Sequence, residues 1–244
     1  GEPTKVGVAV ADVLTGLYAA NAILACLIAR QHSDHGYAID LALLDCTVAA
    51  QVNLMQAYLT RVGQGTPPEQ AAPGLQGNAH AQIVPYQAFA TADGSLVLAV
   101  GNDGQWQRFC SVATPHLNLP EYATNPQRVQ KRATLVPQIA ERLRTRPTAE
   151  WLRDLHAVGV PCAPVANYAE LWQTPQVQAR GMRVTIHDPH GQPVDLLGSP
   201  IHVDGSTPPV RYPPAEGEHT DALLSELANL SASEIAQLRA NGVV

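Results

Sequence analysis

Asp12 has the residue type and setting that most favour chemistry in this sequence. It is the lone carboxylate in the nearly uncharged run of residues 6–20, and a charge on an apolar face must be solvated, paired or used. With Thr15 and Gly16 one turn later, the pattern predicts a carboxylate just inside a helix start. Free N–H groups and the helix dipole there keep it ionised, so that it can attack a carbonyl as a nucleophile. The alternative is an N-cap that only closes the first turn of a buried helix.

The composition describes a globular protein and excludes a nucleic-acid surface. The chain has 244 residues, of which 45% are hydrophobic, enough to bury a core in one large or two small domains. The formal net charge is -6, and only Lys5 and Lys131 are lysines, so no basic stripe exists. The four cysteines lie far apart without CxxC spacing, which favours buried thiols over disulfides. We expect no metal.

Hydrophobic periodicity predicts the elements that must position Asp12. A helix should run from Asp12 to about Gln31 and end at residues 33–36. Residues 37–43 alternate apolar and polar side chains like a strand, and helix followed by strand indicates the α/β class. Residues 44–61 should form a second helix, and the Gly-, Pro- and Gln-rich residues 62–76 an exposed linker.

A second unit should follow the linker. Residues 83–91 and 95–100 are predicted strands around a hairpin turn in which Gly94 supplies a positive φ. Residues 101–104 should lead into a helix, and residues 159–164 should form an extended connector. The arginines of the helices between them are interpreted as a solvated face. The remaining predicted elements are helices at 125–132, 135–144, 148–158, 168–172, 220–228 and 231–240, and a strand pair at 182–187 and 194–197.

Residues 13–29 are apolar over a length that could span a membrane. They lack flanking aromatic anchors and charge asymmetry, and nothing later resembles a second span. We therefore predict a fully buried core helix and no membrane. The chain has no signal-peptide pattern and opens on a loop-like sequence, from which we expect a piece of something longer.

Many segments together resemble the class III CoA-transferases, the family that includes formyl-CoA, carnitine and bile-acid CoA-transferases. The similar segments follow one order through the whole chain: residues 10–18, 24–30, 77–80, 83–89, 93–94, 101–103, 159–162, 175–177, 198–200, 217–220 and 242–244. No single segment is specific, but their common order is strong support. The branch it most resembles acts on succinyl, glutaryl and hydroxymethylglutaryl groups.

The resemblance implies that Asp12 is the nucleophile of an acyl-CoA:carboxylate CoA-transferase. In the family, the equivalent aspartate attacks the acyl-CoA thioester, giving an acyl-aspartyl anhydride and CoA thiolate. The thiolate then forms an aspartyl-CoA thioester, and an acceptor carboxylic acid completes the exchange. Succinyl-CoA or a similar thioester would be the donor. The resemblance implies that no cofactor is bound permanently and that the coenzyme A thioester is a substrate.

The resemblance also implies a loop over the active site. Relatives carry a glycine-rich loop at the position of residues 77–80, so we expect Gly77, Asn78 and His80 to cover the acyl group and donate hydrogen bonds to it. The alternative is a linker that ends in a turn with His80 as a surface side chain. Residues 101–103 are expected to be a structural turn.

The acid's carboxylate needs a cationic anchor, for which Arg108, Arg180 or Arg183 is a guess. Two alternatives to CoA transfer stay open. α-Methylacyl-CoA racemases share the aspartate but use a glutamate after the Asp-Gly hairpin, where residues 101–105 here read GNDGQ, which favours transfer. The other alternative is a catalytically silent structural fragment.

The implied fold is α/β, with a large Rossmann-like domain, a small inserted α+β domain and two chains interlocked as a dimer. Residues 1–65 would carry Asp12 in the large domain, 66–80 the linker and loop, 81–165 the small domain, and 166–244 the return to the large domain. The CoA-binding residues would lie mostly upstream of Gly1 and are unknown. The partner would be a second copy or a complementing N-terminal half, in the cytoplasm, or the mitochondrion of a eukaryote.

Overall fold

The computed structural model of the protein describes residues 4–75 and 77–244. These residues fall into two compact units, Gly1–Val165 and Ala166–Val244. The first begins with helices α1 (Val10–Ser33), α2 (Leu43–Ala50), α3 (Val52–Gly63) and the short α4 (Pro68–Ala71). The predicted first helix is confirmed, and it ends where Asp34 adopts a left-handed φ of 54°. The predicted helix over 44–61 is two helices, because the chain departs from helical geometry at Gln51.

The strand predicted at residues 37–43 is wrong. Residues 37–42 belong to no strand, Leu43 already begins α2, and the apolar side chains of Tyr37, Ile39 and Leu41 are exposed. A strand requires a hydrogen-bonded neighbour, and no described segment pairs with this one. The alternation of apolar and polar side chains is therefore not sufficient to predict a strand here.

A three-stranded antiparallel sheet follows in the order β1-β2-β3, from β1 (Tyr86–Ala90), β2 (Ser95–Ala99) and β3 (Cys162–Pro164). The predicted hairpin is confirmed, with Phe89 opposite Leu96. The connector expected at 159–164 is instead partly an edge strand, because its backbone pairs with β2. Gly94 does not have a positive φ, because the connection is longer than a two-residue turn and is closed by the Thr91 N–H bond to the Gly94 carbonyl.

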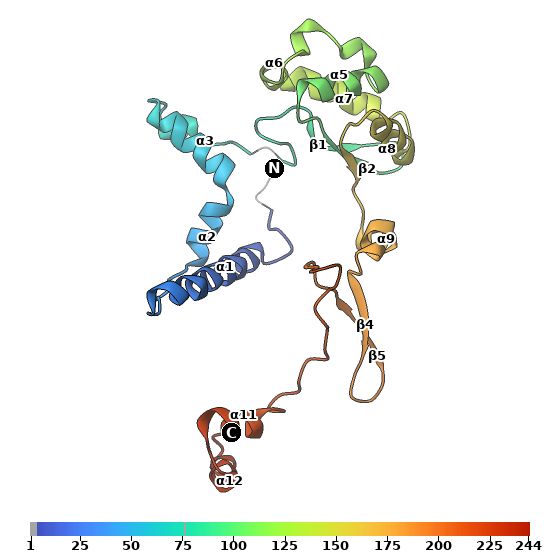
Figure 1. Cartoon of the computed structure of the whole chain (residues 1–244). Coiled ribbons are helices and arrows are strands. Elements are labelled where there is room, and N and C mark those ends of the chain that lie inside the picture. Colours follow the sequence, from blue (N-terminus) through green and yellow to red (C-terminus); the bar gives the residue numbers. More distant parts are fainter. Residues whose placement is uncertain (1–3, 76) are drawn as a thin grey trace. The chain divides into compact units, whose positions relative to one another are not determined.

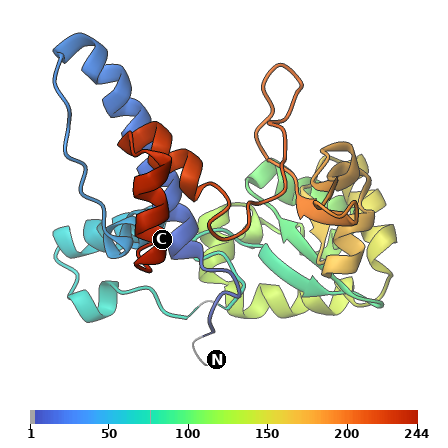
Figure 2. The ribbon, with the colours of Figure 1, turned by 90° about the horizontal axis from the view of Figure 1, so that it is seen from below.

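Helices cover this sheet and enclose the core of the first unit (Figures 1 and 2). They are α5 (Asp103–Val112), α6 (Asn125–Gln130), α7 (Arg132–Leu143) and α8 (Thr148–Ala157), with two 3-10 turns, η1 (Pro115–Leu117) and η2 (Pro120–Tyr122). All four helices lie where helices were predicted. The largest buried side chains, Trp106 and Trp151, are fully enclosed. We call residues 84–162 the packed region.

The second unit contains α9 (Tyr168–Gln173), α10 (Pro175–Ala179), the hairpin β4 (Arg183–His187) and β5 (Pro193–Leu197), and the helical pair α11 (Thr220–Ala228) and α12 (Ala232–Ala240). All of these elements except α10 were predicted, and the two strands are antiparallel. After β5 the backbone of Gly198 passes Gly181 so closely that a Cβ would lie 2.2 Å from the Gly181 oxygen. Only glycine fits at position 198.

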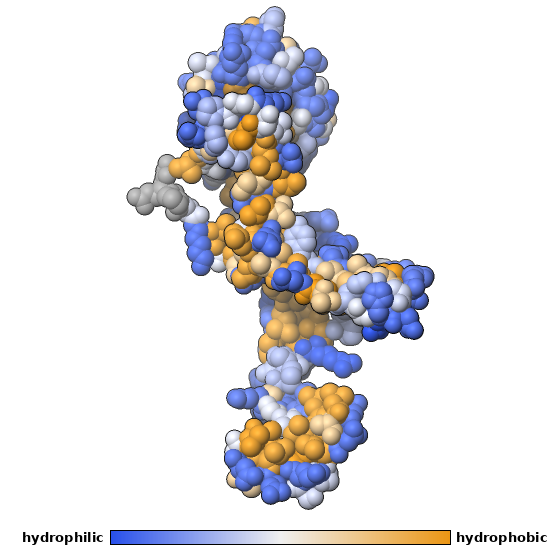
Figure 3. Space-filling view, turned by 90° about the vertical axis from the view of Figure 1, so that its left-hand side faces the viewer, coloured by the Kyte–Doolittle hydropathy of each residue, from blue (hydrophilic) through white to orange (hydrophobic). Residues whose placement is uncertain are grey.

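The prediction that the first helix is a buried core helix is wrong for this structure. No residue of α1 is buried, and its exposed apolar side chains include Leu24 at 59% and Ile28 at 61%. By length and composition α1 could cross a membrane, but none of its most apolar stretch is enclosed. Among the described residues, α2 is the main neighbour of α1, and its contact leaves every residue of α1 at least partly exposed. Apolar side chains also lie open on the pair α11–α12, as the orange surfaces in Figure 3 show.

Candidate active site

Asp12 lies in the first turn of α1. The N-cap residue is Ala9, whose side chain cannot cap, so the N-cap interpretation of Asp12 is wrong. The backbone N–H groups of Ala11 and Asp12 have no hydrogen-bond acceptor among the described residues. These free donors and the helix dipole make the start of α1 favourable for negative charge.

The face of α1 around Asp12 is uncrowded. Residues three and four positions later lie on the same face, and these are Thr15 and Gly16. Thr15 turns its hydroxyl back to the Ala11 carbonyl at 2.8 Å. A Cβ on Gly16 would meet no atom within 4 Å. The glycine therefore leaves room for another group to approach the carboxylate.

Asp12 itself is exposed, and its carboxylate has no hydrogen bond or ion pair with any described residue. If the rest of this helix face were packed against protein, such exposure would indicate that Asp12 is only a solvated surface residue. The apolar side chains of α1 are equally exposed, so this face lacks the packing that its composition demands. A cleft around Asp12 would therefore require further protein against this face of α1.

Residues 77–80 are fastened to strand β1. Gly77 has a φ of 60°, which glycine tolerates and other residues resist. The Asn78 side-chain oxygen accepts a hydrogen bond from the Ala88 N–H at 3.1 Å. The His80 N–H donates to the Tyr86 carbonyl at 2.8 Å, and the two rings stack with centroids 5.3 Å apart. The segment is thus a shaped loop rather than a free linker.

The hydrogen bonds of His80 define its tautomer when the ring is neutral. Its Nδ1 lies 3.1 Å from the Gln82 N–H and accepts a hydrogen bond from it. The proton of a neutral ring must then be on Nε2, which has no acceptor among the described residues. A neutral His80 can therefore donate an Nε2–H hydrogen bond to a ligand.

Three side chains from α6 and α7 hold the segment that follows the loop. Arg132 Nη2 donates to the carbonyls of His80 at 2.7 Å and Ala81 at 2.9 Å. Asn125 donates to the Gln82 carbonyl and accepts from the Val84 N–H. Arg128 Nε donates to the Val84 carbonyl at 2.7 Å. The packed region thus fixes residues 80–84, which no local sequence signal indicated.

The prediction that the arginines of these helices form a solvated face fails at Arg128. Its side chain is fully buried, lies 2.9 Å from an Asp103 oxygen and packs over the Trp106 ring at 5.1 Å. Burial lowers the pKa of the Arg128 guanidinium, while the hydrogen bond that it donates to Asp103 opposes this shift. Asp103 also accepts from the Asn125 N–H. The turn at residues 101–103 is therefore structural, as predicted.

Two of the three predicted carboxylate anchors already have partners. Arg183 is paired with Asp195 in the β4–β5 hairpin, which raises the pKa of Arg183 through that hydrogen bond. Arg108 Nη2 donates to the Gly159 carbonyl at 3.4 Å. Arg180, the C-cap of α10, is exposed and makes no side-chain hydrogen bond to any described residue.

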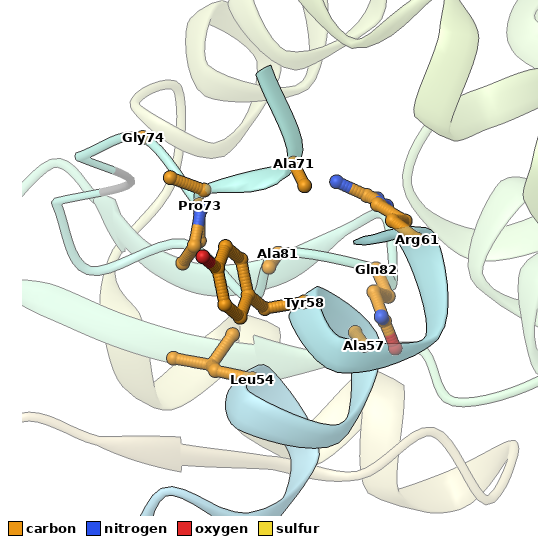
Figure 4. Close-up of a pocket in the computed structure, with 10 residues that line it drawn as sticks. Leu54, Ala57, Tyr58, Arg61, Ala71, Pro73, Gly74, Ala81 and Gln82 are labelled. Atoms are coloured by element: carbon orange, nitrogen blue, oxygen red, sulfur yellow. The ribbon is translucent and has the colours of Figure 1, made fainter. Parts of the chain in front are cut away.

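A small pocket lies between α3 and the segments on either side of the loop. It has a volume of about 120 Å³ and is lined by side chains of α3, by residues 71–74 and by Ala81 and Gln82 (Figure 4). Tyr58 and Arg61 are its main polar side chains from α3. Neither residue was predicted from the sequence to belong to a site.

The structure does not join all predicted site residues. Asn78 and His80 are held on the same strand, but no hydrogen bond or ion pair connects them to Asp12 in the described ranges. Within residues 4–75 and 77–244, no group of His, Cys, Asp and Glu side chains could hold a metal ion.

The four cysteines are free thiols. Cys46 and Cys110 are buried as predicted, whereas Cys26 and Cys162 are half-buried. Burial raises the pKa of the Cys110 thiol to about 11, so it stays protonated and is a poor nucleophile at neutral pH.

Comparisons with known proteins give a consistent family. The model of CoA-transferase family III matches residues 1–220. A succinate–glutarate CoA-transferase of Agrobacterium fabrum is 38% identical over 94% of this chain and 56% of that protein. A succinyl-CoA:glutarate CoA-transferase of Homo sapiens is 34% identical over 100% of this chain and 55% of that protein. The chain therefore spans about half the length of these curated relatives.

A solved structure shows the same fold. The CAIB/BAIF family protein from Brucella suis is 35% identical, with a TM-score of 0.68, and the match covers 93% of this chain and 57% of that one. This likeness confirms the α/β fold class of the family. The strand pairs in the described part of this chain are all antiparallel.

Proposed function

The chain belongs to CoA-transferase family III, and we propose on that basis that it transfers CoA from an acyl-CoA to a carboxylic acid, with Asp12 as the nucleophile. The observation that carries the proposal is the family match together with the setting of Asp12. This carboxylate stands in the first turn of α1 beside an open glycine. Relatives named for succinate and glutarate suggest short dicarboxylic acids as substrates.

The proposed reaction has two covalent stages. An Asp12 oxygen bonds to the thioester carbon of the donor, the C–S bond breaks, and the electron pair leaves on the CoA thiolate. The thiolate then attacks the Asp12 carbonyl of the resulting anhydride, releasing the donor acid and leaving an aspartyl-CoA thioester. The acceptor carboxylate repeats these steps in reverse, which regenerates the Asp12 carboxylate and gives the new acyl-CoA.

The loop supplies the proposed electrostatic support. Each stage places negative charge on a carbonyl oxygen, which positioned N–H donors stabilise. Asn78 has its side-chain oxygen bound to Ala88, which leaves its NH₂ group to donate, and His80 presents Nε2–H. Removing one such donor typically costs about 10²-fold to 10³-fold in kcat. The proposal assigns Gly77 to the left-handed turn that brings these donors over the acyl group.

A protein partner is part of the proposal. The uncovered apolar face of α1 supports assembly with a second copy of the chain or with a complementing N-terminal half. The racemase alternative gains no support, because the segment where a racemase carries its glutamate has none here. Gln105 ends that segment, and its amide oxygen accepts a hydrogen bond from the Gly101 N–H at 2.7 Å.

Trapping the adduct tests the proposal. We expect incubation of the full-length protein with succinyl-CoA to add a covalent mass to the peptide that contains Asp12, detected by mass spectrometry. Asp12→Ala should lose the adduct and reduce turnover at least about 10⁴-fold. Asp40→Asn changes another exposed aspartate without described partners and should keep both. An active Asp12→Ala enzyme would favour the silent or structural alternative.

A further inference from the structure

The small pocket beside the loop combines unpaired polar groups with small apolar walls. The guanidinium of Arg61 and the hydroxyl of Tyr58 line it, and neither makes a hydrogen bond or ion pair with any described residue. In Figure 4 the Arg61 side chain reaches toward Ala71, and the Tyr58 hydroxyl points toward Pro73. The Gln82 side chain completes the polar lining.

This lining matches a carboxylate on a short carbon chain. A guanidinium offers paired N–H donors in the geometry that a carboxylate accepts, and a tyrosine hydroxyl can add a third hydrogen bond. The methyl groups of Ala57 and Ala81 offer contact to methylene groups. The volume of about 120 Å³ is somewhat below the roughly 150 Å³ of a cavity that holds a benzene molecule, so it suits such a small fragment.

We infer that Arg61 and Tyr58 bind the remote carboxylate of a dicarboxylic acyl group or acceptor acid. The inference rests on the proposed CoA transfer and deepens it, because it assigns the residues that would select dicarboxylic over monocarboxylic acids. It also replaces the earlier anchors Arg108 and Arg183, which already have partners.

The position of the pocket along the chain supports this role. Its walls Ala81 and Gln82 directly follow His80, whose Nε2–H is available to a ligand. The same segment is fixed by Arg132 and Asn125, so the pocket wall and the loop form one held piece of backbone. An acid bound at Arg61 would therefore extend along the loop that the proposed mechanism places over its reacting end.

Arg61 also stands in the last turn of α3, where a cation complements the helix dipole without any ligand. The test must separate these roles. Arg144, the exposed C-cap residue of α7, has a similar setting at a helix end, makes no side-chain bond to any described residue and lies in the same unit. Arg144→Gln is therefore a matched control.

The experiment compares glutarate with valerate, which has the same chain length but one carboxylate, in the full-length protein. We expect Arg61→Gln to lower kcat/KM for glutarate about 100-fold and to leave valerate within about twofold. Tyr58→Phe should give a smaller loss for glutarate only, and Arg144→Gln no loss. Calorimetric titration with glutarate alone should show weakened binding in Arg61→Gln, and circular dichroism should report an unchanged fold.

The outcomes for this pocket and for the proposed function are distinguishable. If Arg61→Gln lowers glutarate and valerate equally, or neither, the pocket is not a carboxylate site although CoA transfer can still stand. If the wild-type protein transfers no CoA yet binds glutarate through Arg61, the proposed reaction fails and the carboxylate site stands. If glutarate binds equally to the wild type and Arg61→Gln, the site is overturned whatever the activity.

Discussion

Helices α1 and α7 both carry apolar side chains, but only α7 buries them. Helix α7 encloses Leu135, Ile139 and Leu143 completely in the packed region. Helix α1 is twice as long, with 24 residues against 12, and encloses none. The packed region thus closes a core with its own sequence, whereas the region that carries Asp12 presents apolar surface.

The difference separates what stabilises the chain from what performs the proposed chemistry. Burial of apolar area is the main favourable term in folding, so the stability of the first unit is concentrated in residues 84–162. Asp12 lies outside that core, on a helix whose apolar face needs a further surface. The loop at residues 77–80 connects the two, because the packed region holds it.

Matched leucine truncations should test this contrast most strongly. Leu143→Ala removes a fully buried side chain and should lower the free energy of unfolding by about 3 to 5 kcal/mol. Leu24→Ala removes a side chain that is 59% exposed and, at protein concentrations too low for a second copy to bind, should change it by less than about 0.5 kcal/mol. Urea unfolding followed by tryptophan fluorescence measures both, because Trp106 and Trp151 report on the core.

A large loss of stability in Leu24→Ala would break the contrast. It would mean that α1 is covered in solution, by a second copy or by other protein. Repeating the unfolding over a range of protein concentrations distinguishes these cases, because only cover by a second copy makes the midpoint depend on concentration.

The buried arginine gives a smaller expected effect within the packed region. Arg128→Met keeps much of the volume but leaves the carbonyls of Val84, Tyr122 and Ala123 without this donor. Buried acceptors without partners are costly, so we expect a loss of about 3 kcal/mol in unfolding free energy. Hydrogen exchange should also quicken around Val84. Arg144→Met, at an exposed position, should change neither, and an equal effect there would contradict the special role of Arg128.

Sequence reasoning succeeded where the signal was local. The course of α1 to within two residues at each end, the hairpin β1–β2 and the pair α11–α12 were predicted from caps, turns and periodicity, all of which act over a few residues. The position of Asp12 in a first helical turn was available in the same way.

Several of the failures required a partner distant in the sequence. Residues 37–43 have the alternation of a strand but no described neighbour, and β3 forms because β2 lies beside it. Arg128 looked solvated because its acceptors at Val84 and Asp103 are 44 and 25 residues away. The pocket at Arg61 likewise joins α3 to residues 71–74 and 81–82, which periodicity cannot bring together.

The smallest expected effect is a pH dependence at the hairpin of the packed region. Hydrogen bonds to Asp93 from the Thr148 N–H at 2.7 Å and the Thr148 hydroxyl at 2.9 Å lower the pKa of its carboxyl group. Its folded pKa lies below the unfolded value of about 3.9, so its ionised form stabilises the fold above about pH 4. This contribution is lost as the pH falls through the folded pKa.

Asp93→Asn should therefore lower the urea midpoint at pH 7, and its difference from the wild type should shrink at pH 3. Asp40→Asn, whose aspartate has no described hydrogen-bond partner, should shift neither midpoint. A deficit in Asp93→Asn that stays constant from pH 7 to pH 3 would show that the shape of the side chain matters and its charge does not. The hydrogen bonds between Asp93 and Thr148 join the hairpin to α8. A difference in urea midpoint that shrinks from pH 7 to pH 3 would therefore assign this pH dependence of stability to the packed region and not to α1.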